Sequence, residues 1–190
     1  MSAAADDGGA KSFWRTLPGI LTGLAGLVGA VGSLLVGLYA TGILGGNGPS
    51  PSKVERLEGE GAVGVSADRV MARSEASGAR TVLVFGGESL SLAFSLDNAA
   101  SCVFAVRYSN DNFGDLEQVA VAVDGSATGG FDSRDTGGEG QGWNTFEMTD
   151  RIGPIDLLAG PHHVELTVVG GDGRGLEVDY VEADCAGKAG

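Results

Sequence analysis

The sequence predicts an all-β sandwich or jelly roll, preceded by one transmembrane α-helix. A run from Leu17 to Leu44 contains no charged residue. Beyond residue 57, short runs of apolar residues recur between turn residues, and some of them alternate apolar with polar positions, which is typical of antiparallel strands. Glycine accounts for 34 of the 190 residues, as expected where tight turns join many short strands.

The N-terminal part of the chain predicts a membrane anchor. Residues 1–16 form a short segment, and residues 17–44 are long enough to cross a bilayer, which needs about 20 apolar residues. The alternative is a secretory signal peptide, but Leu38 stands where a small residue would be needed for cleavage after Ala40. Basic residues flank the span on both sides, so the positive-inside rule does not decide the orientation. We expect a single-pass protein of the cell membrane with residues 1–16 in the cytoplasm.

Small residues along the span would permit self-association of this helix, because they let two helices approach closely. Glycine is also common in membrane helices generally, which is the alternative explanation. The small residues follow one another at steps of three and four: Gly19, Gly23, Gly26, Ala30 and Ser33.

A linker and a β-domain follow the span. Residues 45–56, GGNGPSPSKVER, are rich in Gly, Pro and Ser without an apolar pattern, which predicts a flexible connection. The domain is expected over residues 57–185, with a tail at 186–190. Its predicted strands are shorter pieces near 57–65 and the runs at 81–85, 90–96, 102–108, 119–123, 143–148, 163–169 and 176–181.

The charge of the domain limits its partners. The net charge of the chain is −13, and all of it arises after residue 52. An acidic surface without a basic patch is a poor partner for nucleic-acid phosphates. Cations and neutral polar ligands are therefore the expected partners, and nucleic acid is not.

Three carboxylates at the two ends of the domain predict a cation site. Glu58 and Glu60 are two residues apart, so they share one face if this segment is a strand. The first and last strands of a domain often lie close together, which would bring Asp179 to them. Calcium prefers such oxygen ligands, whereas solvated charges on edge strands are the alternative.

Several motifs resemble carbohydrate-binding modules of families 6 and 35, which are galactose-binding-like jelly rolls. LEGE resembles their opening strand, and GESLSLAFSLDNAASCVFAVRYSN resembles a pair of their strands with the intervening turn. VAVAVDG resembles the next strand and its turn, and GQGWNTF resembles their GGWxTW motif. LLAGPHHVELTVVGGDGRGLEVDYVE resembles their closing segment and is the most specific match. The resemblance covers residues 57–184.

This resemblance implies a non-catalytic, extracytoplasmic module that binds a glycan or polysaccharide and holds a structural calcium ion. It implies Glu58, Glu60 and Asp179 as the calcium ligands. It also implies Trp143 as the aromatic platform for a sugar ring, whereas a core aromatic is the alternative for this residue.

The sequence departs from the family at two points of the sugar site. Only Phe85 is available where the family often has a second aromatic residue. The family's asparagine before the last strand is missing, so Asp172, Arg174 or Glu177 would have to replace it. A degenerate module that serves as an extracytoplasmic protein-interaction or structural domain is therefore the competing prediction.

Two further features complete the sequence prediction. Cys102 and Cys185 both fall at strand ends, and a disulfide between them is favoured over two buried free thiols because the domain is expected outside the cytoplasm. His162 and His163 are adjacent in a strand, so they point to opposite faces and are poorly placed to share a zinc ion. With no catalytic constellation in the sequence, we expect no enzymatic activity.

Overall fold

The computed structural model describes residues 52–111, 116–137 and 143–188. The chain divides into two compact units, Met1–Gly48 and Pro49–Gly190, and every described residue lies in the second. The predicted transmembrane span at 17–44 lies outside the described residues. Within the described part of the chain, no helix is both long enough and apolar enough to cross a membrane.

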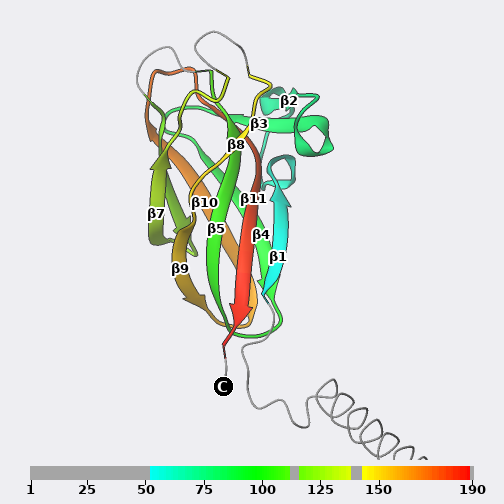
Figure 1. The fold of residues 1–190 in the computed structure, drawn as a ribbon, viewed down its shortest axis with the longest axis vertical. Helices are drawn as coiled ribbons and strands as arrows, with labels where there is room; N and C mark the ends of the chain where they lie inside the picture. The colour runs from blue at the N-terminus through cyan, green and yellow to red at the C-terminus, as the bar shows by residue number, and fades with distance from the viewer. Residues whose placement is uncertain (1–51, 112–115, 138–142, 189–190) are drawn as a thin grey trace, which may run out of the picture. The chain divides into compact units, whose positions relative to one another are not determined.

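The second unit is a sandwich of two antiparallel sheets (Figure 1). In the seven-stranded sheet, β11 and β5 are the central strands, and the other strands pair with one of these two or, for β2, with β3. Its strands are β1 (Lys53–Glu58), β2 (Val70–Ala72), β3 (Arg80–Val84), β5 (Ala100–Ser109), β8 (Glu147–Met148), β9 (Ile152–Leu157) and β11 (Leu176–Gly187).

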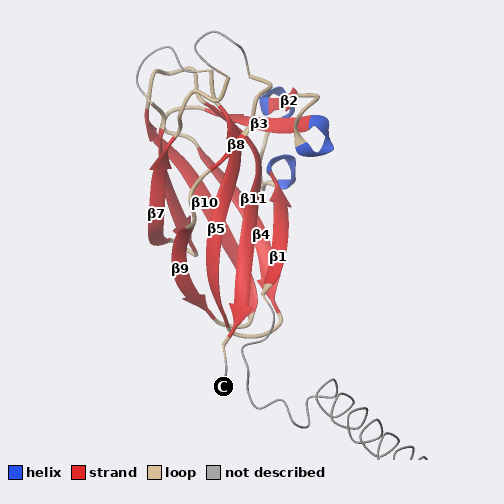
Figure 2. Cartoon of the chain, viewed as in Figure 1, coloured by secondary structure: helices blue, strands red, loops and turns tan. Residues whose placement is uncertain are grey.

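The four-stranded sheet has the order β4–β10–β6–β7. Its strands are β4 (Ser89–Leu96), β6 (Gln118–Val123), β7 (Ser126–Asp132) and β10 (Gly160–Gly170). The helical turns are short 3₁₀ segments, drawn blue beside β1, β2 and β3 in Figure 2. They are η1 (Gly59–Gly61), η2 (Ala67–Arg69) and η3 (Ser77–Ala79).

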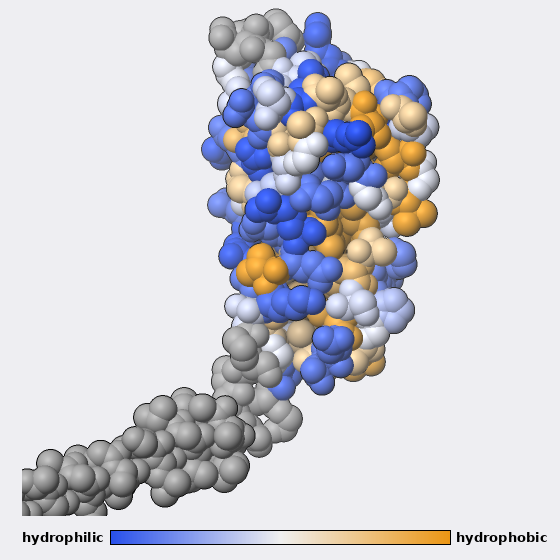
Figure 3. All heavy atoms as spheres, turned by 90° about the vertical axis from the view of Figure 1, so that its right-hand side faces the viewer, coloured by the Kyte–Doolittle hydropathy of each residue, from blue (hydrophilic) through white to orange (hydrophobic). Residues whose placement is uncertain are grey.

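The core lies between the two sheets and is built by period-two alternation. In β4, Leu90, Leu92 and Phe94 are buried, and the residues between them are more exposed. Phe94 meets Phe104 of β5 edge to face, with 5.9 Å between the ring centroids. Alternating side chains reach opposite faces of a strand, so one face of each sheet is apolar and the other is available for polar contacts. On the face of the domain in Figure 3, hydrophilic residues cover much of the surface and hydrophobic residues gather toward the right edge.

The predicted all-β sandwich is confirmed, with differences in its elements. The runs at 81–85, 90–96, 102–108, 119–123 and 163–169 correspond to β3, β4, β5, β6 and β10. Only Glu147–Met148 of the run 143–148 is a strand, and three strands had no predicted counterpart: β2, β7 and β9. Weak alternation explains these omissions, since β7 is SATGGFD with no buried residue and β9 contains Pro154.

The first and last strands are neighbours. β1 pairs with β11 from Lys53 opposite Cys185 to Glu58 opposite Tyr180. β1 therefore begins inside the segment predicted as a linker, because Lys53–Arg56 pair with β11. Glu60 does not continue this strand, since the chain turns into η1 after Glu58.

A disulfide joins the two central strands of the larger sheet. Cys102 of β5 lies directly opposite Cys185 of β11, and the two residues are bonded to each other. Both are buried, and their separation of 83 residues encloses most of the domain.

Candidate functional site

A β-bulge in β11 determines where Asp179 points. The register of β11 against β5 shifts between Val178, which pairs with Tyr108, and Tyr180, which pairs with Arg107. A bulge adds one residue to a strand and so changes which face the following side chains reach. Val178 and Val181 consequently both pack into the core cluster, contrary to a strict alternation, whereas Tyr180 is buried against the Arg56 guanidinium. Asp179, the extra residue, is completely buried.

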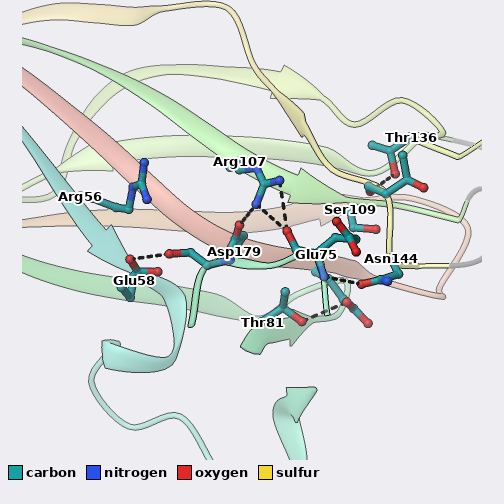
Figure 4. Close-up of polar contacts among 12 residues, drawn as sticks. Arg56, Glu58, Glu75, Thr81, Arg107, Ser109, Thr136, Asn144 and Asp179 are labelled. Atoms are coloured by element: carbon teal, nitrogen blue, oxygen red, sulfur yellow. Dashed lines mark hydrogen bonds and ion pairs between the residues drawn. The ribbon is translucent and has the colours of Figure 1, made fainter. Parts of the chain in front are cut away.

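The three carboxylates predicted for a cation site surround the turn formed by Ser77 and Gly78. The backbone N–H of Ser77 donates to Asp179 Oδ1 at 2.9 Å, and its hydroxyl donates to Glu58 Oε1 at 2.9 Å (Figure 4). A Cβ atom on Gly78 would lie 3.1 Å from Glu60 Oε1. The segment around Ser77 therefore links the end of β1 to the bulge of β11.

Asp179 already has a cationic partner in the protein. Arg107 of β5 forms an ion pair with Asp179 Oδ2, and its guanidinium also donates to the Glu75 carbonyl at 3.2 Å. The same guanidinium lies 4.6 Å above the ring of Phe146. Phe146 is half-buried, and its ring packs against this guanidinium.

Two oxygen atoms at this place have no partner. Glu58 Oε2 and Glu60 Oε2 are buried, and neither accepts a hydrogen bond. Within the described residues, no group of three or more Asp, Glu, His or Cys side chains gathers as a metal ion would require. The carboxylates of Glu58 and Glu60 thus retain free acceptor capacity, whereas that of Asp179 is already engaged.

Glu177 is part of a buried ion pair. Only 1% of the residue is exposed, and its Oε2 accepts hydrogen bonds from Arg73 Nε at 2.7 Å and from Thr81 Oγ1 at 2.9 Å. Arg73 also contacts Oε1, and the hydrogen bonds to Glu177 raise the pKa of the Arg73 guanidinium. Glu177 therefore does not face solvent as a sugar ligand would, because Arg73 and Thr81 occupy its oxygens.

Trp143 lies at the end of the sandwich where β5 ends and β11 begins. It is partly exposed, and its carbonyl oxygen accepts a hydrogen bond from Ser109, the last residue of β5. Beside it, the Asn144 side chain donates to Ser74 Oγ at 2.8 Å and accepts from the Glu75 N–H at 3.1 Å. These contacts fix the backbone that carries the indole.

A second set of hydrogen bonds holds the same segment from the other side. Thr136 Oγ1 lies 2.7 Å from the Thr145 carbonyl and 3.1 Å from the Asn110 carbonyl, so it links this segment to the end of β5. The indole therefore stands on backbone that is anchored to two separate segments, as a preorganised binding platform requires. Serine, threonine and asparagine in irregular segments gave no pattern from which these contacts could be predicted.

The remaining predicted sugar contacts lie at the same end of the sandwich. Phe85 follows β3, and a Cβ atom on Gly175 would lie 3.0 Å from its ring. Arg69 covers one face of Phe85, with 4.4 Å between the guanidinium carbon and the ring centroid, and also pairs with Glu88. Asp172 and Arg174 lie in the turn before β11, where the Arg174 N–H donates to Asp172 Oδ1 at 2.8 Å.

Solved structures with a similar fold include carbohydrate-binding modules. A family 35 carbohydrate-binding module from Clostridium thermocellum is 16% identical, with a TM-score of 0.52 over 69% of this chain and 97% of that one. A family 35 module from an environmental isolate is 17% identical, with a TM-score of 0.55 over 68% of this chain and 91% of that one.

An exo-beta-1,3-galactanase from Phanerochaete chrysosporium also contains this fold. It is 19% identical, with a TM-score of 0.52, and the match covers 69% of this chain but only 29% of the enzyme. No protein-family model and no curated protein matches the chain. At these identities the likeness shows the fold alone.

Proposed function

We propose that the domain is a non-catalytic carbohydrate-binding module that binds glycans at the end of the sandwich carrying Trp143. The observation that carries this proposal is a partly exposed tryptophan on an anchored segment of a fold shared with carbohydrate-binding modules. An aromatic ring suits a sugar because the faces of a pyranose are apolar and its rim is polar. Asn144, Asp172 and Arg174 supply polar groups around the same end.

Trp143→Ala tests this role on a glycan array. We expect the purified full chain to bind a subset of glycans and the variant to lose at least about 30-fold in affinity, the size of a tryptophan hot spot. Trp14→Ala is the matched control, since it removes the other tryptophan from a position outside the β-domain. A wild-type chain that binds no glycan, or equal loss in both variants, would contradict the proposal.

A protein-interaction or structural role is the second candidate. Two predicted sugar contacts are engaged within the fold, because Glu177 is buried against Arg73 and one face of Phe85 is covered by Arg69. This observation favours a module that keeps the scaffold without the sugar site. A blank array from a chain that is folded by circular dichroism would support this candidate over the first.

We also propose a structural calcium ion held by Glu58 and Glu60, with Asp179 as the third ligand. The support is chemical: two buried carboxylate oxygens, Glu58 Oε2 and Glu60 Oε2, lack any donor, and calcium prefers oxygen ligands. Asp179 would have to share its carboxylate between the ion and Arg107. The ion would neutralise two negative charges where β1 turns into η1 beside the β11 bulge.

Removal of calcium tests this site independently of glycan binding. A ligand that binds only the folded state stabilises it by about 2.7 kcal/mol at a concentration 100 times its Kd, so a chelator should lower the melting temperature by several degrees. Glu60→Gln should abolish the sensitivity to the chelator. An unchanged melting curve, together with no calcium in the purified protein, would refute the site.

For the cellular setting, we propose that residues 17–44 anchor the chain in the cell membrane and present the β-domain outside the cytoplasm. The charge-free length of this segment supports the anchor, and the disulfide agrees with an oxidising compartment. The small residues at helical spacing support self-association of the span.

A further inference from the structure

Glu117 is a buried carboxylate with one unpartnered oxygen. It lies directly before β6, and only 1% of the residue is exposed. Its Oε2 accepts hydrogen bonds from Asn110 Nδ2 at 2.6 Å and from Ser133 Oγ at 3.1 Å. Its Oε1 is buried and accepts no hydrogen bond. Because a carboxylate loses its hydration on burial, an unmatched oxygen at this place needs a positive or proton-donating partner.

The group that meets Glu117 is another acid. The Asp172 carboxyl group, in the turn that joins β10 to β11, lies close enough to Glu117 for a hydrogen bond, but two ionised carboxylates have no hydrogen to donate, so the bond requires a proton on one of them. This turn rests directly on Glu117, since a Cβ atom on Gly171 would lie only 2.8 Å from Glu117 Cγ. The positive φ of +148° at Gly171 also favours glycine. The turn can therefore pack this closely only with glycine at residue 171.

Two ionised carboxylates in contact repel each other, so one of them keeps its proton to a higher pH unless a cation lies between them. We propose that Glu117 and Asp172 share one proton, and that the resulting hydrogen bond holds the β10–β11 turn against the start of β6 in acid. Near neutral pH this proton is lost, the hydrogen bond breaks and the turn is released. The proton would reside on Glu117, whose free oxygen then donates to the Asp172 carboxylate.

The surroundings of Glu117 agree with a retained proton. Asn110, at the end of β5, and Ser133, after β7, are neutral donors to Glu117, and Asp172 is the ionisable neighbour that raises its pKa. Burial, followed by the contact with Asp172, raises the pKa of Glu117 to about 6, and the hydrogen bonds from Asn110 and Ser133 oppose this rise. The ordinary pKa of a glutamate is about 4.3.

Because the pKa of Glu117 is raised in the folded state, the stability of the domain should fall as the pH increases. A carboxyl group whose pKa is raised in the folded state binds more protons there than in the unfolded chain. Its contribution to stability is fully present below the ordinary pKa and is lost as the pH rises through about 6. Asp172 and Arg174 lie in the β10–β11 turn. Glycan affinity should therefore change with pH at the midpoint of the Glu117 titration, a consequence that rests on the proposed function.

The test is a carbon-13 NMR titration of the side-chain carboxyl groups in the full chain. We expect Glu117 to titrate near pH 6, with the amide signals of residues 170–175 changing at the same midpoint. Asp172→Asn should bring the Glu117 midpoint down by at least one pH unit, because the amide donates a hydrogen bond to ionised Glu117. Asp97→Asn is the matched control, since Asp97 is exposed in the β4–β5 turn at the other end of the sandwich.

Three results would overturn the proposal. The first is a Glu117 midpoint at the ordinary value, and the second is a midpoint that Asp172→Asn leaves in place. The third is a midpoint that shifts with calcium or a chelator, since a metal ion would then take the place of the proton. None of these readouts involves a sugar, so failure of glycan binding leaves the test intact.

Discussion

Replacing Arg73 with methionine is expected to lower the free energy of unfolding by about 3–5 kcal/mol, the usual cost of leaving one partner of a buried ion pair unmatched. Glu177 is 1% exposed, and without Arg73 it would retain only the hydrogen bond from Thr81. Methionine preserves much of the aliphatic stem of Arg73, so the loss of stability reports on the missing charge. Urea unfolding, monitored by circular dichroism, measures this loss.

Two variants separate this effect from a general loss of packing. Arg73→Met combined with Glu177→Gln should recover most of the stability, because the amide leaves no buried charge and still accepts from Thr81. Arg151→Met also removes an arginine–carboxylate ion pair, the one between Arg151 and Asp184. This pair is more exposed to solvent, since the Arg151 side chain is 56% exposed. This substitution should cost no more than about 1 kcal/mol. If Arg73→Met costs no more than Arg151→Met, the structural role assigned to Glu177 is wrong.

Loss of the disulfide is the second large effect. Replacing both Cys102 and Cys185 with alanine should lower the free energy of unfolding by about 4–5 kcal/mol in the loop-entropy model. The reason is the long segment enclosed by the bond, whose ends are 83 residues apart. The unfolded chain gains freedom when this segment is released, whereas the folded sheet keeps its register. Urea unfolding of the two forms measures the difference.

A reducing agent provides the control for the disulfide. It should destabilise the wild-type chain by a similar amount and leave the double-alanine variant unchanged. Equal stability of the oxidised wild type and the double variant would contradict the predicted contribution.

The strands of the core were predictable because their alternation reports directly on burial. LSLAFSL and CVFAVRY place large apolar residues on one face, and the structure buries these residues. The closeness of the first and last strands was also predictable, and β1 pairs with β11. The change of face in VDYV was not, because the bulge at Asp179 depends on the pairing of β11 with β5 rather than on local sequence.

The partners of charged residues were the least predictable part of the site. Glu177 meets Arg73, 104 residues earlier in the chain, and Asp179 meets Arg107, 72 residues earlier. Only the tertiary fold selects these arginines from the ten basic residues that follow the span. Arg107 gave a weak signal, as a charged residue within the apolar run CVFAVRY.

The role of Trp143 can be observed directly by fluorescence. The chain contains two tryptophans, so Trp14→Phe leaves Trp143 as the single indole. This variant should be titrated with the oligosaccharide that gives the strongest array signal. Stacking of a sugar on the indole should change its emission with the same Kd that calorimetry reports. Unchanged emission in a titration where calorimetry shows full binding would mean that the glycan binds away from Trp143, and the central proposal would be wrong.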